Sequence, residues 1–461
     1  MNKLAKYRIL SYITLIFFLS TTILPSPALA IHTSNWDNGG GNADGTTQTG
    51  GNPMNGDGGN PNHNSGCAGD PVYLHSGEFF YECSDLYIPG RGMDVHITHL
   101  YQSSAHHNSQ FGYGWTINYH YRLQPLENGN VVILSGLARK DEYSAQGNNT
   151  YAPPPGFFET LKQNTDGSWT LLKAHGEKYQ FDIDGKLRAI EDRNNNAITF
   201  TYDTDGLQPI VGIPTFAAEE LPTRQVVGFD YKLIQITDTV GRKVSLNYNA
   251  DGLLSSIRDY AGREVRFTYD SKTNDLLSVT KPKTPQFPAG LTKKFTYDRE
   301  HNLTSITDAK GQKFVTNTYN ANGQVVRQDL GAGTFLFQYS SKNTKVIDRR
   351  GFETNYTYND AGNIIKVEQF TKGVRGDDPA SYITTYTYNS DMLMTAVTYP
   401  KGNGVLFTYD QNSSDPRRRG NALSLRRKAD MAAGNSSNDI VQTVTYEPQF
   451  NFIKTYTDGN G

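Results

Sequence analysis

Alternating apolar and polar positions mark short strands along most of the chain. In the stretch 251–270 (DGLLSSIRDYAGREVRFTYD), the residues Val265, Phe267 and Tyr269 alternate with polar ones. In 111–123 (FGYGWTINYHYRL), every odd position is apolar or aromatic and every even position is small or polar. A period of two is the signature of a half-buried strand. The pattern therefore predicts an all-β protein.

Turn signals separate the strands. Segments 249–252 (NADG) and 259–262 (DYAG) both place Asn or Asp first and Gly fourth, as a type I β-turn prefers. One detail resists a simple strand. Leu254 and Ile257 are three positions apart, so strict alternation would put them on opposite faces. Either a bulge intervenes, or both faces of this strand are packed.

The strand–turn unit recurs about every 20 residues. The interval is 21 residues from Tyr248 to Tyr269 and 22 from Tyr297 to Tyr319. A Tyr followed by Asp, Asn or a substitute occurs at Tyr202, Tyr248, Tyr269, Tyr297, Tyr319, Tyr339, Tyr358, Tyr388, Tyr409 and Tyr446. Such a period predicts units that contact mainly their neighbours. We therefore expect a β-hairpin array over 186–461, preceded by a non-repeating antiparallel β domain over 67–185.

The first 66 residues differ from the rest. Residues 1–30 combine a basic start, an apolar run and the small-x-small sequence ALA, which predicts a signal peptide cleaved after Ala30. Residues 31–66 are rich in Gly and Asn and nearly free of apolar side chains, so they predict a disordered linker. We expect export, either to the cell envelope or outside the cell. No transmembrane span is expected in the mature chain.

Two cysteines, Cys67 and Cys83, remain after the predicted cleavage. An even count in an exported chain favours a disulfide. It would close a loop of about 15 residues and stabilise the fold by roughly 3 kcal/mol. Two separate buried thiols are the alternative.

The composition of the chain bears on its fold class and on whether it is expected to bind nucleic acid. The net charge is −2, and 29 Tyr and 44 Gly agree with a turn-rich β architecture. A net charge this close to zero gives no electrostatic reason to expect nucleic-acid binding. The basic runs 417–419 and 426–428 are interpreted as solvated loops.

Candidate chemistry is sparse. Seven of the ten histidines lie between His63 and His120. His96 and His99, however, are three apart on a predicted strand and so face opposite ways, and no metal site is predicted. Most Asp residues are explained by turns, and no nucleophile elbow, phosphate loop or dinucleotide motif occurs in the right context. We therefore expect no catalytic or cofactor-binding residue, and no enzyme activity. Exposed tyrosines that stack on sugar rings would make a carbohydrate-binding surface the alternative.

The repeat resembles the YD repeat of the Rhs family, which also occurs in the B and C components of insecticidal Tc toxins and in teneurins. The resemblance rests on FTYD at 267–270 and 295–298 and on YNDAGNIIKV from Tyr358. The stretch from Gly69, together with FGYGWTINY from Phe111, is similar to the domain that precedes the repeats in many Rhs proteins. The resemblance to the family implies a spiralling β-sheet shell that encloses a C-terminal toxin, which is released after self-cleavage at an Asp-Pro motif.

This sequence departs from the family at that motif. Its Asp-Pro pairs begin at Asp70, Asp378 and Asp415, and none has the Gly-rich, Tyr-bearing setting of the family motif. The array is also short for closing a shell. Neither autoproteolysis nor a toxin activity is therefore carried over.

The expected function is that of an exported Rhs/YD-repeat scaffold or shell protein, which mediates cell-surface or intercellular interactions without catalysis or cofactor. The alternatives are a carbohydrate-binding surface module and a truncated core of a polymorphic toxin-delivery protein that lacks its C-terminal effector. The expected partners are glycans or a separately encoded C-terminal Rhs or toxin partner, with no nucleic acid.

Overall fold

The computed structural model describes residues 67–68, 71–105, 108–136, 139–203, 231–373 and 375–459. The predicted signal peptide with its cleavage site at Ala30, and the predicted linker 31–66, lie outside these residues. Both therefore stay predictions. Within the described ranges, no helix has the length and apolar character needed to cross a membrane.

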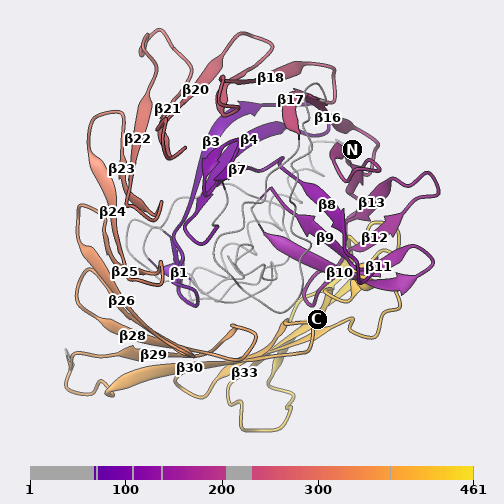
Figure 1. Ribbon diagram of the computed structural model, residues 1–461. Helices are drawn as coiled ribbons and strands as arrows, with labels where there is room; N and C mark the ends of the chain where they lie inside the picture. The colour runs from indigo at the N-terminus through magenta and orange to yellow at the C-terminus, as the bar shows by residue number, and fades with distance from the viewer. Residues whose placement is uncertain are drawn as a thin grey trace, which may run out of the picture.

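A single antiparallel sheet dominates the described part of the chain. Its 28 strands, β8 to β35, each pair with the next strand in sequence. Short turns favour this arrangement, since a tight turn can only join antiparallel neighbours. Figure 1 shows that the sheet is strongly curved along its length. The all-β fold with a continuous repeat sheet is thus confirmed.

The strands of this sheet are β8 (Arg122–Pro125), β9 (Val131–Leu134), β10 (Lys140–Gly147), β11 (Thr150–Ala152), β12 (Thr160–Gln163), β13 (Trp169–Leu172), β14 (Lys178–Phe181), β15 (Leu187–Glu191), β16 (Ala197–Asp203), β17 (Lys232–Thr237), β18 (Lys243–Tyr248), β19 (Leu254–Arg258), β20 (Glu264–Tyr269), β21 (Leu276–Thr280), β22 (Thr292–Tyr297), β23 (Leu303–Thr307), β24 (Lys313–Tyr319), β25 (Val325–Asp329), β26 (Thr334–Ser340), β27 (Asn343–Ile347), β28 (Glu353–Tyr358), β29 (Ile364–Phe370), β30 (Ser381–Tyr388), β31 (Met394–Thr398), β32 (Gly404–Tyr409), β33 (Ala422–Lys428), β34 (Ile440–Tyr446) and β35 (Ile453–Thr457). A short 3₁₀ helix, η1 (Pro416–Arg418), precedes β33.

A smaller sheet lies on the concave side of the large one (Figure 1). This inner sheet has the order β3 (Phe80–Ile88), β4 (Val95–Gln102) and β7 (Trp115–Ile117). Two further two-stranded ladders accompany it, β1 (Cys67–Ala68) with β2 (Val72–Tyr73), and β5 (Asn108–Ser109) with β6 (Gly112–Tyr113).

The main core lies between the inner sheet and the repeat strands. Trp115 of β7 is fully buried, and its ring lies 5.1 Å from that of Phe295 on β22. Tyr81 of β3 contacts the same Phe295, with ring centroids 6.0 Å apart. Burial of aromatic side chains of this size dominates core energetics. The inner sheet is therefore an integral layer that covers the concave face of these repeats.

A β-bulge at the repeat tyrosine decides between the two arrangements left open for Leu254 and Ile257. Asn247 pairs with Ser256 but Tyr248 pairs with Leu254, so the register skips Ser255. Leu254 and Ile257 are consequently both buried. Among the ten repeat tyrosines the register shifts at every one except Tyr339. Bulges increase local twist and bend the strand, which agrees with the strong curvature of the sheet.

The sheet comes back on itself. In the loop after β34, the ring of Phe452 stacks on that of His175, which lies in the β13–β14 turn, with centroids 5.1 Å apart. The Arg193 guanidinium lies 4.6 Å from the centre of the Phe452 ring. The expectation that the array is short for closing a shell stays a prediction, but the described sheet completes one turn. The reason for this curvature is that strand twist accumulates over many strand pairs.

The sheet also runs past the expected domain boundary at residue 186 without a break, because β14 pairs with β15.

Candidate functional site

Seven of the ten repeat tyrosines join their repeat to the preceding one. The Tyr297 hydroxyl donates to the carbonyl oxygen of Leu276 at 2.7 Å, and Tyr319 donates to that of Leu303 at 2.9 Å. Leu276 is the residue that pairs with the preceding repeat tyrosine, Tyr269. The same relation holds for Tyr248, Tyr339, Tyr388, Tyr409 and Tyr446. These bonds form a hydroxyl–carbonyl ladder.

The ladder removes the tyrosines from solvent. Burial raises the pKa of Tyr297 well above its ordinary value, so its hydroxyl remains protonated and donates. All ten repeat tyrosines are buried or half-buried rather than exposed. These ten rings therefore offer little open face to a sugar, but other tyrosines of the sheet are exposed, Tyr382 to 39% and Tyr456 to 38%. The carbohydrate alternative stays a prediction.

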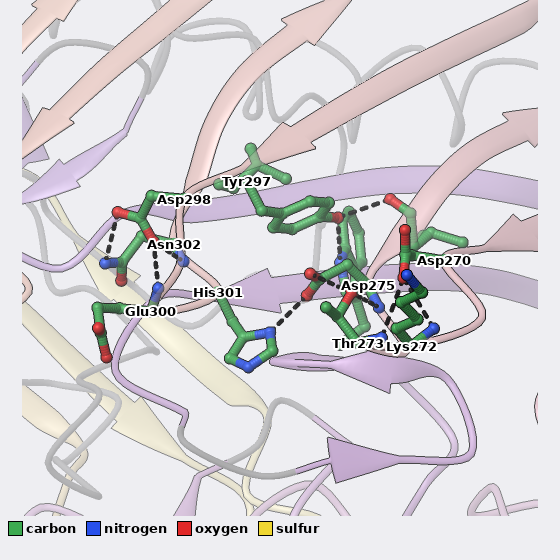
Figure 2. Close-up of polar contacts among 12 residues, drawn as sticks. Asp270, Lys272, Thr273, Asp275, Tyr297, Asp298, Glu300, His301 and Asn302 are labelled. Atoms are coloured by element: carbon green, nitrogen blue, oxygen red, sulfur yellow. Dashed lines mark hydrogen bonds and ion pairs between the residues drawn. The ribbon is translucent and has the colours of Figure 1, made fainter.

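The acidic residues of the repeat are used in turns. The Asp298 carboxylate accepts the backbone N–H groups of Glu300 and Asn302 at 2.9 Å, and also the Asn302 side-chain amide at 3.0 Å (Figure 2). Asp259 binds the N–H groups of Ala261 and Arg263 in the same way. The geometry confirms the turn interpretation of these two aspartates.

At one turn the usual glycine is replaced by His301, and this residue docks the inner sheet. His301 has a φ of 65°, and its ring stacks on Tyr113 with centroids 3.9 Å apart. Its Nδ1 lies 2.9 Å from an Asp275 carboxylate oxygen (Figure 2). Its carbonyl oxygen accepts the Tyr101 hydroxyl at 3.0 Å. A non-glycine residue in the left-handed backbone conformation costs conformational energy. At His301 this cost is accompanied by specific contacts with Tyr113, Asp275 and Tyr101.

A charged cluster is buried where β3 and β4 meet β21 and β22. We call it the inner cluster, and it contains Cys83, Asp85, His99, Lys281 and Lys293. Asp85 lies 2.7 Å from His99 Nδ1 and 3.2 Å from the Lys281 ammonium. The Lys293 ammonium lies 2.7 Å from the Tyr81 hydroxyl and 3.4 Å from the Cys83 sulfur. The repeats therefore place two cations against the inner sheet.

The strand register explains why these side chains meet. Cys83 and His99 are direct cross-strand partners, and the register shift after Ser84 makes Asp85 the bulged residue. Burial alone would raise the pKa of Asp85, but His99 and Lys281 outweigh it and hold the pKa below its ordinary value. Asp85 is thus a buried anion that depends on its contacts with His99 and Lys281.

Three members of the inner cluster have the chemistry of metal ligands. Donor atoms of Cys83, Asp85 and His99 lie within 4.8 Å of one another, and all three residues are buried. The ammonium groups of Lys281 and Lys293, however, already stand against Asp85 and Cys83. A divalent cation at this point would be repelled by both ammonium groups in a low-dielectric site. The positive charges of the lysines fit this cluster better than a metal does.

The structure describes the side chains of some of the predicted site residues and not of others. Cys83 is buried, and its sulfur lies 3.4 Å from the Lys293 ammonium. The side chain of Cys67 lies outside the described residues, so the predicted pairing stays a prediction. His96 and His99 have different surroundings, as expected: His96 is half-exposed beside Tyr87, whereas His99 is buried against Trp115.

A second buried charged cluster lies on β10, β12 and the end of β13. Arg139 binds Asp141 at 2.8 Å, and Glu159 accepts hydrogen bonds from the Tyr143 hydroxyl and the Lys173 ammonium. Burial raises the pKa of Asp141 to about 6, although Arg139 opposes the rise. Each carboxylate is held by a cation, an arrangement typical of a structural ion-pair network.

The interpretation of the basic runs as solvated loops was wrong: Arg417 and Arg418 lie in η1, and residues 426–428 lie in β33, where Lys428 is buried. Several of these side chains are also paired with acids. Arg417 lies 2.7 Å from Asp415, and Arg426 lies 3.1 Å from Asp439, which Lys428 also approaches. Local acids thus offset much of this positive charge.

The sequence analysis did not single out Asp85, Lys281 or Lys293. The available signal was the presence of two acids, Glu82 and Asp85, within the strand FYECSDLYI.

Comparisons with known proteins agree with this architecture. A family model described as "RHS Repeat" matches residues 248–285, and one described as "Teneurin YD-shell" matches 291–414. A domain of unknown function (DUF6531) matches 69–143, which contains the inner sheet.

Among curated proteins, the chain is 24% identical over 303 residues to the tRNA nuclease WapA of Bacillus subtilis (strain 168). The tRNA3(Ser)-specific nuclease WapA of Bacillus spizizenii matches to the same extent. The match covers 55% of this chain and 13% of each relative, so the chain spans only a small part of their length.

Among solved structures, the TcdB2-TccC3-Cdc42 complex matches at 14% identity with a TM-score of 0.37, over 71% of this chain and 20% of that one. The matches to the repeat and to the preceding domain, in their expected order, show that the chain belongs to the Rhs/YD-repeat family.

Proposed function

We propose that the chain is a scaffold of an Rhs-type shell, which holds an effector polypeptide against its concave face and has no catalytic role. The observation that carries the proposal is a continuous sheet that returns on itself. Among the described residues, the inner sheet covers its concave face in some repeats and leaves it uncovered in others. The family and its nuclease relatives support a toxin-delivery setting.

Equivalent positions in early and late repeats show the uncovered part. Leu254 and Ile257 pack under the inner sheet and are 1% and 0% exposed. By their place after the repeat tyrosine, the corresponding residues on β35 are Ile453 and Tyr456, which are 45% and 38% exposed. Apolar side chains at these positions are a surface on which an extended polypeptide gains hydrophobic burial.

The proposal also includes export and a lack of catalysis. In the described residues, the buried carboxylates of both charged clusters are paired with cations, so neither cluster offers a free general base. The predicted cleavage after Ala30 would place the chain in the cell envelope or outside the cell, where a separately encoded C-terminal partner could join it. N-terminal sequencing of the exported protein should then begin at Ile31.

A protease-protection experiment tests the holding role. An unstructured segment with one site-specific protease site is fused to the C-terminus of the full chain, and its cleavage rate is measured. Two apolar contacts are each worth about 1.5–3 kcal/mol, so replacing Ile453 and Tyr456 by Asp should speed cleavage by at least about tenfold. Leu336→Asp on the outer face is the control and should leave the rate unchanged. Equal rates in all three proteins would overturn the proposal.

A further inference from the structure

We infer that the outer face of β26–β28 carries a binding site for a neutral, hydroxyl-rich ligand, a sugar unit of a glycan. A hollow of about 330 Å³ opens there, lined by Gln338, Tyr339, Ser340, Asn343, Lys345 and Asn355. This site is separate from the concave face and independent of the proposed holding role.

The hollow coincides with the one repeat hairpin that lacks a bulge. Tyr339 is followed by Ser340 instead of Asp or Asn, and it pairs with Thr344 without a register shift. The two strands therefore stay in regular register up to a tight turn. Regular register sets side chains of the same face in straight rows across neighbouring strands.

One such row supplies the binding groups. Gln338 pairs with Lys345, which in turn pairs with Asn355 on β28. Neighbouring Phe337 and Tyr356 are buried in the core, so these three side chains face outward. The structure gives the amides of Gln338 and Asn355 no hydrogen-bond partner among the described residues. Each amide can donate and accept at once, as can each hydroxyl of a sugar.

The charge and shape of the hollow indicate the class of ligand. The Lys345 ammonium lies 2.7 Å from the Glu353 carboxylate, so the row is close to neutral and does not favour an anion. Among the lining residues, Tyr339 points inward and donates to the Val325 carbonyl oxygen, so no aromatic face is offered to a nucleobase. An apolar pocket for a peptide anchor is also missing from the lining. Paired amides with an ion pair beside them suit vicinal hydroxyl groups.

A binding experiment on the full chain tests the site. Maltose, cellobiose and di-N-acetylchitobiose are titrated by saturation-transfer NMR and calorimetry. At least one should bind saturably, and Gln338→Ala with Asn355→Ala should weaken it at least tenfold. Gln235→Ala removes a half-buried side-chain amide from β17, outside this row, and serves as the control.

Three outcomes would overturn the inference. They are no saturable binding of any of the three sugars, equal weakening by Gln235→Ala, and tighter binding of an acidic peptide or an oligonucleotide at the same residues. Because neither amide contacts the concave face, the protection assay should be unchanged in the double variant. Failure of the sugar site and failure of the holding role are thereby distinguished.

Discussion

The hydroxyl–carbonyl ladder makes a sharp prediction, because two neighbouring tyrosines differ in their hydrogen bonds. The Tyr297 hydroxyl donates to the Leu276 carbonyl and accepts the Trp115 indole N–H at 2.9 Å. The Tyr269 hydroxyl is buried and has no hydrogen-bond partner among the described residues. The two side chains occupy equivalent positions one repeat apart, so replacing each with Phe removes the same atom from contrasting surroundings.

The magnitudes follow from that contrast. Tyr297→Phe leaves a buried carbonyl and a fully buried indole N–H unpaired, at about 1–3 kcal/mol for each group. We expect a total loss of about 2–6 kcal/mol. Tyr269→Phe removes a polar atom that is already unpaired, and it should be neutral or stabilise the protein by up to about 1 kcal/mol.

Urea unfolding of the wild type and the two variants, followed by circular dichroism, measures both effects. Because each repeat depends mainly on its neighbours, the near-ultraviolet signal of Trp115 provides a local readout next to Tyr297. The reasoning is refuted if Tyr269→Phe costs as much as Tyr297→Phe. It is also refuted if Tyr297→Phe changes the free energy of unfolding by less than about 0.5 kcal/mol.

Three further predictions concern charges and turns. Asp141 has its pKa raised from 3.8 to about 6, so it stabilises the folded state below pH 4 and loses that contribution as the pH rises through 6; relative to Asp141→Asn, the wild type should lose about 3 kcal/mol of stability between pH 4 and 7 in denaturant titrations. Asp85→Asn should cost about 2–3 kcal/mol, less than for a fully buried pair because Lys281 can return to water, and thermal melts should reveal it. Asp259→Ala should cost about 1–2 kcal/mol because two backbone N–H groups lose their acceptor. Gly262 has a φ of 81°, and an added Cβ would make only an ordinary contact with the Arg258 side chain, so Gly262→Ala should cost a similar amount, about 1–2 kcal/mol, through backbone strain. Differential scanning calorimetry would show no loss in either variant if the turns are not under these constraints.

Much of the fold could be predicted because its information is local. Alternation of two, Asx-x-x-Gly turns and a period near 20 residues depend only on residues close in sequence, and they indicated the hairpin array. Where the pattern broke, the break was informative. The spacing of Leu254 and Ile257 left a bulge or two packed faces open, and the structure shows the bulge. The His301 that replaces a turn glycine lies where the inner sheet docks.

The candidate site was less accessible. Asp85 and Lys281 are almost 200 residues apart, and no periodicity announces that they form an ion pair. Cys83 and His99 become partners only through the register of β3 and β4. The hollow beside Gln338 depends on the absence of one bulge, which the substitution after Tyr339 hints at without defining.

The sequence by itself determined the strands, the turns, the repeat and the family, because turn chemistry and strand alternation are set by neighbouring residues. The tertiary structure alone decided that the sheet returns on itself, which repeats the inner sheet covers, and which face each charge occupies. Those features arise from small twists and register shifts summed over many strand pairs. Each such step is too small to leave a mark in the sequence, but together they bring distant residues into contact.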